Sequence, residues 1–177
     1  VLDGMLMKDE PGAYRMATFS DEHMNRLFEK FVLEYFKVHH KGVSANTEHV
    51  EWGIDLDKSP MIDFLPAMKT DITLRKDNHV LIIDTKYYGS TLQYNFNRAS
   101  IHSNNLYQVF SYVKNEDKGN TGDVEGMLLY AKTQEEISPD LDAVFGKNRI
   151  RVKTLDLNKE FIDIAEQLDN IYKSSFE

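Results

Sequence analysis

The sequence predicts a three-layer α/β/α sandwich with a mixed central sheet. Three observations lead to this fold class. The first periodic segment of the chain is an apolar stripe with helical spacing, alternating or unbroken apolar runs typical of strands follow it, and two further amphipathic segments interrupt and end those runs. Strands that are apolar on both faces need helices on both sides, and the helical segments are placed in the chain to supply them.

The first helix is expected over Asp21–His39. Ser20 is a suitable N-cap, and the acidic residues of the first turn complement the helix dipole. The residues that form its apolar stripe are Met24, Leu27, Phe28, Phe31, Val32 and Tyr35. Glu29 borders the stripe on one side and Glu34 on the other, so either could reach a site at the edge of the sheet. The alternative is a solvated glutamate on an amphipathic helix.

Residues 69–87 are predicted to form two strands joined by a tight turn. The first strand alternates apolar and polar residues, whereas residues 80–83 are apolar without a break, which is typical of a strand covered on both faces. Residues 77–78 are Asp-Asn, and both tolerate the left-handed backbone angles of tight turns. A two- or four-residue loop would pair Thr73 with Ile82.

The same register places Asp71 opposite Asp84. Directly opposed Cβ atoms lie about 4.5–5.5 Å apart, and like charges so placed destabilise a sheet unless a positive group lies between them. A divalent cation would fit there, because Mg²⁺ takes oxygen ligands and is usually held by one or two carboxylates. Side chains alternate along a strand, so Lys86 points to the same side as Asp84, and Thr85 points away. Two carboxylates and a lysine suit metal-assisted phosphodiester hydrolysis; the alternative is a hairpin whose ends carry surface charges.

The remaining elements follow from composition and period. Residues 89–103 are polar and are interpreted as a long loop at the mouth of the site. The other expected elements are a strand within 47–57, a helix over 104–115, a strand over 124–132, an irregular segment over 138–147, a strand over 149–157 and a helix over 159–172. On the helix over 104–115, Gln108 and Tyr112 lie one turn apart and could present an amide and a phenol to a phosphate or a base; the alternative is that the two side chains simply border the core.

Composition limits the function classes. The 177 residues suffice for one domain, no apolar run approaches the ~20 residues that span a bilayer, and a cytoplasmic protein is expected. The absence of cysteine excludes disulfides, thiolate zinc sites and Fe–S clusters. The net charge of −8 is unusual for a protein that holds DNA by itself. Either DNA is not the substrate, or the affinity comes from a local groove or another subunit.

Asp71, then Asp84-Thr85-Lys86, together with a preceding helix bearing Glu29 and a following helix bearing Gln108 and Tyr112, resembles the PD-(D/E)xK nuclease superfamily. Within it, four segments in the same order are similar to the McrC family, the nuclease subunits of modification-dependent McrBC-type restriction systems. These segments are residues 24–32, 82–88, 105–112 and 126–130. The proline that the family carries before its first Asp is Thr70 here.

The resemblance implies a restriction-endonuclease-like core and a role for each matched residue. Asp71 and Asp84 would bind Mg²⁺, for which Mn²⁺ would substitute, and the backbone carbonyl of Thr85 would be a further ligand. Lys86 would position the attacking water and stabilise charge on the phosphate. Glu29 would complete the acidic site, which favours it over Glu34. The pair Gln108 and Tyr112 would orient the site or touch the DNA backbone.

The resemblance also implies the partners. An McrB-like AAA+ GTPase would activate the nuclease through a region that nothing in this sequence matches. We therefore expect residues 1–19 to be the remnant of a preceding region and residues 20–177 to be the nuclease domain. The alternatives are a RecB-like exonuclease, a junction resolvase of the same superfamily, and a non-catalytic assembly module on the same fold.

Overall fold

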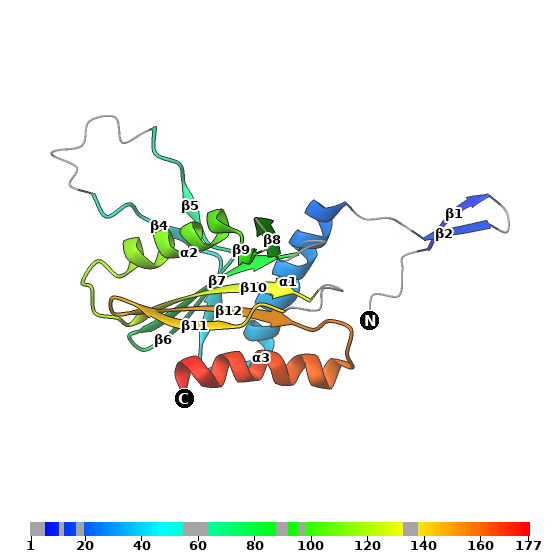
Figure 1. Ribbon diagram of the computed structural model, residues 1–177. Helices are drawn as coiled ribbons and strands as arrows, with labels where there is room; N and C mark the ends of the chain where they lie inside the picture. The colour runs from blue at the N-terminus through cyan, green and yellow to red at the C-terminus, as the bar shows by residue number, and fades with distance from the viewer. Residues whose placement is uncertain are drawn as a thin grey trace.

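The computed structural model describes residues 6–10, 13–16, 20–54, 64–87, 92–95, 98–132 and 138–177. Its elements, shown in Figure 1, are β1 (Leu6–Glu10), β2 (Ala13–Met16), α1 (Asp21–His39), β3 (Ser44–Asn46), β4 (His49–Val50), β5 (Met68–Lys69), β6 (Ile72–Lys76), β7 (His79–Lys86), β8 (Leu92–Asn95), β9 (Arg98–Ile101), α2 (Ser103–Glu116), β10 (Val124–Ala131), β11 (Leu141–Phe145), β12 (Asn148–Leu155) and α3 (Phe161–Phe176).

A six-stranded mixed sheet forms the centre of the molecule, in the order β11-β12-β10-β7-β6-β3. Its three middle strands, β12, β10 and β7, run parallel, and the flanking pairs β11·β12, β7·β6 and β6·β3 are antiparallel. All eight residues of β10 are buried, as expected for a strand at the centre of a sheet that is covered on both faces.

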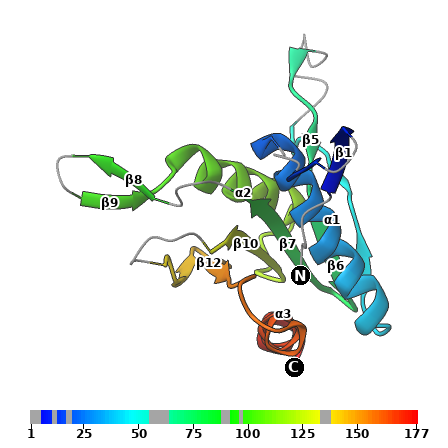
Figure 2. The same ribbon diagram turned by 90° about the vertical axis from the view of Figure 1, so that its right-hand side faces the viewer.

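Helices cover both faces of this sheet, as Figures 1 and 2 show. One apolar cluster joins α1 and α3 to alternate residues of β6, β7 and β10, and a second joins α2 to the intervening residues of β7, β10 and β12. The predicted class, α/β with a mixed central sheet between helical layers, is therefore confirmed.

Gly126 of β10 explains how closely α2 approaches the sheet. A Cβ atom added at Gly126 would lie 2.5 Å from Val109 Cγ1 and 2.8 Å from Val113 Cγ2, both on α2. These distances are shorter than van der Waals contact, so only glycine lets the helix pack at this depth.

The β6–β7 hairpin has the predicted register. Thr73 pairs with Ile82, the ladder ends at Ile72 and Ile83, and Asp77 in the two-residue turn has a φ of 53°. Left-handed φ is tolerated by aspartate better than by most residues, because its short polar side chain can bond to the local backbone.

Several element predictions were wrong in extent. Within 47–57 only His49–Val50 is a strand among the described residues, and it pairs with β5 rather than with the main sheet. The segment 138–147, expected to be irregular, contains β11, which returns along β12 through a turn where Gly146 has a φ of 68°. An edge strand has one neighbour and one exposed side, so it lacks the apolar pattern of a central strand.

The predicted loop over 89–103 contains β8 and β9, which pair with each other. Their polar composition gave no strand signal, because backbone pairing within a hairpin does not require a buried apolar face. Residues 6–16 likewise include the paired strands β1 and β2, where the sequence showed no period.

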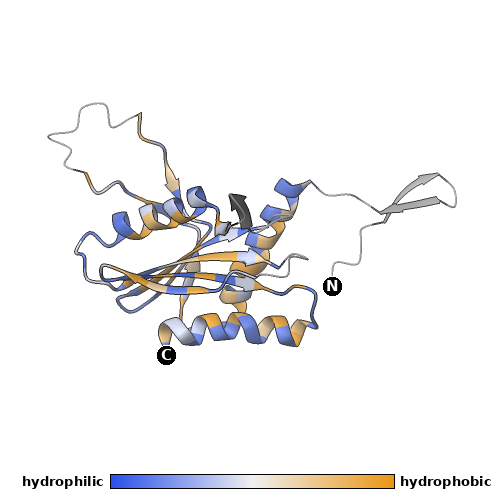
Figure 3. Cartoon of the chain, in the orientation of Figure 1, coloured by the Kyte–Doolittle hydropathy of each residue, from blue (hydrophilic) through white to orange (hydrophobic). Residues whose placement is uncertain are grey.

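Hydropathy follows the layers. Figure 3 shows apolar residues along the central strands, with apolar and polar residues interleaved along the helices, as amphipathic packing requires. Within the described ranges, no helix is both long enough and apolar enough to pass through a membrane.

Candidate active site

Asp84 and Lys86 lie at the end of β7 and face the layer that contains α2. Asp84 is fully buried, and Lys86 Nζ lies 2.6 Å from Asp84 Oδ2, with only 14% of the lysine side chain exposed. The contact arises because residues two apart on a strand point to the same side. The site therefore contains a lysine held directly against a buried carboxylate.

Asp71 stands one residue before β6 and approaches β7 from the side. Its Oδ2 accepts hydrogen bonds from the backbone N–H of Thr85 at 2.7 Å and from Thr85 Oγ1 at 2.9 Å. Asp71 and Asp84 were expected to pair across the ladder, but strand pairing stops at Ile72 and Ile83. The Asp71 carboxylate instead accepts the Thr85 N–H, which would otherwise bond to a backbone carbonyl of β6.

Burial dominates the electrostatics of Asp84. It raises the pKa of this carboxyl from 3.8 to about 7, an effect that the adjacent Lys86 opposes and that the negative charges of Asp71 and Glu29 strengthen. Because its pKa lies near 7, Asp84 releases its proton to a competing cation at little cost in free energy near neutral pH. A bound cation would then compensate the carboxylate charge, which the apolar surroundings do not.

Glu29 reaches the same region from α1. Burial, followed by the charge of Asp71, raises its pKa, whereas Lys69 and Lys86 lower it. The alternative residue, Glu34, is exposed and forms an ion pair with Lys37 at 2.8 Å. The structure therefore places Glu29, and not Glu34, within electrostatic reach of Asp71 and Asp84.

Gln108 and Tyr112 form a connected pair on α2. Gln108 Nε2 donates to Tyr112 Oη at 2.8 Å, and Tyr112 Oη donates to the backbone carbonyl of Lys69 at 2.9 Å. Burial raises the pKa of Tyr112, the hydrogen bond from Gln108 lowers it, and the charges of Asp84 and Asp71 raise it further. The pair thus ties α2 to the chain two residues before Asp71.

Two residues near the site were missed by sequence reasoning. Asn25 Oδ1 accepts the backbone N–H of Tyr87 at 2.6 Å, and Thr70 exchanges hydrogen bonds with the backbone of Glu48. A signal existed for Asn25, since it precedes Glu29 by four residues and so shares its helix face. Thr70 stands out in the sequence only because it occupies the position where the family carries a proline, and that comparison gave no sign of these hydrogen bonds.

One buried carboxylate oxygen of the site has the free coordination position that a divalent cation would need. Among the residues that the structure describes, the buried Asp84 Oδ1 has no hydrogen-bond partner. A buried, unpartnered carboxylate oxygen is costly unless a proton or a cation occupies it. No cluster of three or more His, Asp or Glu side chains suited to a metal occurs in the described part of the chain. Two carboxylates without a third such side chain would suit a cation that completes its coordination with water, as Mg²⁺ does.

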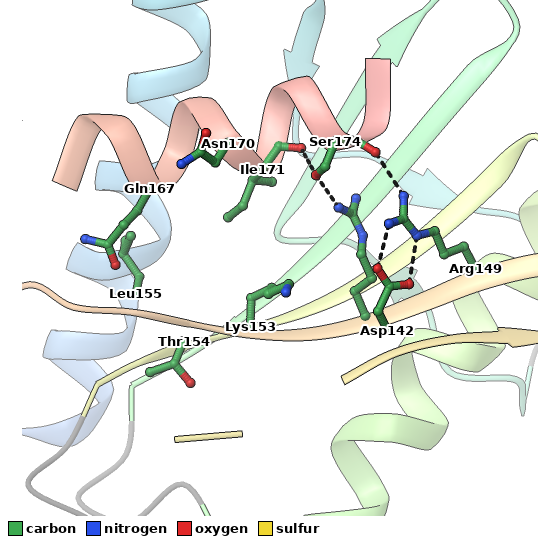
Figure 4. A pocket seen from close by; sticks show the side chains of 10 residues that line it. Asp142, Arg149, Lys153, Thr154, Leu155, Gln167, Asn170, Ile171 and Ser174 are labelled. Atoms are coloured by element: carbon green, nitrogen blue, oxygen red, sulfur yellow. Dashed lines mark hydrogen bonds and ion pairs between the residues drawn. The ribbon is translucent and has the colours of Figure 1, made fainter. Parts of the chain in front are cut away.

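A pocket of about 360 Å³ lies elsewhere, between β12 and α3 (Figure 4). Its charged lining residues all have ionic partners: Arg149 binds Asp142 through two hydrogen bonds of 2.8 and 2.6 Å, Lys153 binds Asp140 at 2.6 Å, and Arg151 binds Glu125 at 2.8 Å. None of the predicted site residues lines it, and its charges are already compensated.

Comparison with known proteins gives a family match over the region that contains the candidate site. Residues 22–131 match the family described as McrBC 5-methylcytosine restriction system component. The chain is 24% identical over 175 residues to the type IV methyl-directed restriction enzyme EcoKMcrBC of Escherichia coli strain K12; this alignment covers 98% of the chain and 48% of the relative. The chain thus spans about half the length of the curated relative that it matches.

The family match includes α1, the β6–β7 hairpin, α2 and β10, and therefore every residue of the candidate site. Since it covers more than half of the 177 residues, it settles the family. The chain belongs to the family of McrBC 5-methylcytosine restriction system components.

Proposed function

We propose that this chain is the Mg²⁺-dependent DNA endonuclease domain of a modification-dependent restriction system, with a PD-(D/E)xK core. The observation that carries the proposal is the buried Asp84 with Lys86 at 2.6 Å and Asp71 beside it, at the end of a central strand within the family-matching region. A buried carboxylate with an unpartnered oxygen and a charged neighbour is costly for a fold, and it is typical of functional sites.

Asp71 and Asp84 would hold the Mg²⁺ ion, with the backbone carbonyl of Thr85 as a further ligand, and Mn²⁺ would substitute for it. Asp71 bonds Thr85 through Oδ2 alone, so within the described residues its Oδ1 is available. When bound, the cation supplies positive charge that polarises the phosphate and lowers the pKa of a coordinated water.

The chain's own groups have distinct tasks in phosphodiester hydrolysis. Lys86 Nζ donates hydrogen bonds that orient the attacking water and stabilise the charge that develops on the phosphate oxygens. Asp84 holds Lys86 Nζ in place through their 2.6 Å contact. The water loses a proton as it adds to phosphorus, and Glu29, whose pKa is raised, is suited to accept that proton. The ester P–O bond breaks in the same step, and the leaving oxygen takes a proton from solvent water. Gln108 and Tyr112 hold the segment that carries Asp71.

The substrate and partner follow from the family and the charge. The relative is named as methyl-directed, so we propose modified DNA as the substrate and an McrB-like AAA+ GTPase as the activating partner. A net charge of −8 favours weak, salt-dependent DNA binding by this chain alone, with the partner holding the DNA.

The proposal is tested by nicking of supercoiled plasmid in Mn²⁺, comparing the wild type with Lys86→Met. We expect the variant to bind Mn²⁺ but to nick at least 100-fold more slowly, because the ligands remain and the charge at the reacting phosphate is lost. Lys118→Met is the matched control, since Lys118 pairs with Glu51 on the surface at 3.2 Å. Equal nicking by wild type and Lys86→Met would overturn the proposal.

A further inference from the structure

The end of β7 has an open side. Pairing with β6 ends at Ile83, whereas pairing with β10 on the other side continues until Tyr130 meets Lys86. The backbone N–H groups of Thr85 and Tyr87 therefore lack a strand partner where β6 has ended. An unpaired backbone donor at the edge of a core must find another acceptor.

Two side chains supply these acceptors. Asp71 Oδ2 accepts the N–H of Thr85 at 2.7 Å, and Asn25 Oδ1 accepts the N–H of Tyr87 at 2.6 Å. Asp71 comes from the chain leading into β6, and Asn25 comes from α1. The two bonds bracket Lys86, so the segment that carries this lysine is held on three points: β10, Asp71 and Asn25.

The same turn of α1 makes a second contact with Tyr87. The ring of Phe28 meets the ring of Tyr87 edge to face, with 6.3 Å between centroids. Asn25 and Glu29 are one helical turn apart and lie on one face of α1. The helix that brings Glu29 to the site is thus fastened, through Asn25 and Phe28, to the residue that directly follows Lys86.

We infer that Asn25 is a positioning residue that holds Lys86 in a fixed relation to Glu29 and the two aspartates. The inference rests on the proposed nuclease function and deepens it. Asn25 acts through the backbone of Tyr87. Asp71 and Asp84 are held independently, by Thr85 and by the β10 ladder, so loss of Asn25 affects the placement of the lysine and leaves the carboxylates in position.

The test uses three variants. Asn25→Ala removes the acceptor, and Asn25→Asp keeps an acceptor of the same shape. Gln167→Ala is the matched control: Gln167 Oε1, on α3, accepts the backbone N–H of Asp156 just past the end of β12 at 2.9 Å, and β12 is separated from β7 by β10. Each alanine variant thus removes one amide side chain that caps a strand end.

Amide hydrogen exchange by NMR reports the bond without reference to activity. In Asn25→Ala we expect exchange at Tyr87 to accelerate at least 10-fold, with Thr85 unchanged, and Asn25→Asp to restore protection. Unchanged exchange at Tyr87 in Asn25→Ala would overturn the inference, because the side chain would then not hold the strand.

Kinetics report the consequence. We expect Asn25→Ala to lower kcat for plasmid nicking by about 10- to 100-fold, the effect of a small misplacement of a catalytic group, while KM and the Mn²⁺ dissociation constant stay within about threefold of the wild type. Asn25→Asp is expected to recover most of kcat, and Gln167→Ala to keep it. A normal kcat in Asn25→Ala, or a loss in Asn25→Asp equal to that in Asn25→Ala, would overturn the positioning role. A wild type that neither binds Mn²⁺ nor nicks would instead overturn the proposed function, and hydrogen exchange would still decide whether Asn25 anchors Tyr87.

Discussion

Replacing Asp84 with asparagine is expected to remove a pH dependence from the stability of the metal-free protein. The folded state raises the pKa of Asp84 from 3.8 to about 7, mainly through burial. Between these two values the folded state binds a proton that the unfolded state has released, so folding becomes less favourable as pH rises. The contribution is fully present below pH 3.8 and is lost as pH rises to about 7.

The magnitude follows from the size of the shift. Each pKa unit corresponds to about 1.4 kcal/mol, and linkage over the window from pH 5 to pH 8 gives a relative loss of about 2–3 kcal/mol in the wild type. The asparagine introduced in Asp84→Asn does not titrate, so the stability of the variant lacks this loss. The absolute difference between the two proteins also contains the cost of leaving Lys86 without its partner, and for that reason the change with pH is the quantity to compare.

The assay is urea unfolding of both proteins at pH 5 and pH 8 in the presence of EDTA. Asp117→Asn is the control, because Asp117 is a buried carboxylate with the opposite shift. Burial would raise the pKa of Asp117, but hydrogen bonds from the backbone of Gly122 and Thr121 and from Asn148 lower it to about 2. Its loss should therefore cost about 2 kcal/mol at both pH values, since the contribution disappears only as pH falls from 3.8 toward 2. Parallel pH dependence in wild type and Asp84→Asn would refute the reasoning.

Three further changes have defined outcomes. Gly126→Ala is expected to destabilise the fold by about 1–3 kcal/mol through overpacking against Val109. Adding Val109→Ala should relieve part of this loss, and a double variant whose loss of unfolding free energy in urea equals the sum of the two single losses would contradict the clash. Thr70→Val is expected to cost about 1–3 kcal/mol by leaving the backbone N–H of Glu48 without its acceptor, and an unchanged midpoint would show that water replaces the hydroxyl. Lys69→Gln, at an exposed lysine whose charge acts on Glu29, is expected to weaken DNA binding and reduce the slope of log K against log salt by about 1, whereas an unchanged slope would mean that Lys69 contacts no phosphate.

The parts of the site that depend on local periodicity could be predicted from the sequence. The β6–β7 register follows from a two-residue turn and from the alternation of side chains, and it places Lys86 beside Asp84 as expected. Helix α1 begins and ends where its N-cap and apolar stripe predicted, because both signals lie within a few residues of the positions that they determine.

The contacts that depend on tertiary packing could not be predicted in the same way. The bond between Asn25 and Tyr87 joins residues 62 apart in the chain, and it exists only because α1 packs against the open side of β7. The hydrogen bonds of Thr70 with Glu48 depend equally on the pairing of β4 with β5. The backbone N–H of Thr70 donates to Glu48 O at 2.9 Å, a bond that a proline at this position could not make.

The edge strand β11 was missed for a related reason. Its pairing with β12 is set by the turn at Gly146 rather than by an apolar alternation, and Val144 and Phe145 remain largely outside the core. Sequence patterns report burial, so they predict central strands such as β7 and β10 better than strands whose order depends mainly on backbone pairing.

The most direct test of the proposed metal-dependent site is isothermal titration of Mn²⁺ into the wild type and into Asp84→Ala, with nicking of supercoiled plasmid followed in parallel. We predict that the wild type binds Mn²⁺ and nicks the plasmid, and that both properties disappear in the variant. Failure of the wild type to bind Mn²⁺, even with DNA present, would contradict the assignment of Asp71 and Asp84 as metal ligands and favour a non-catalytic assembly role on the same fold.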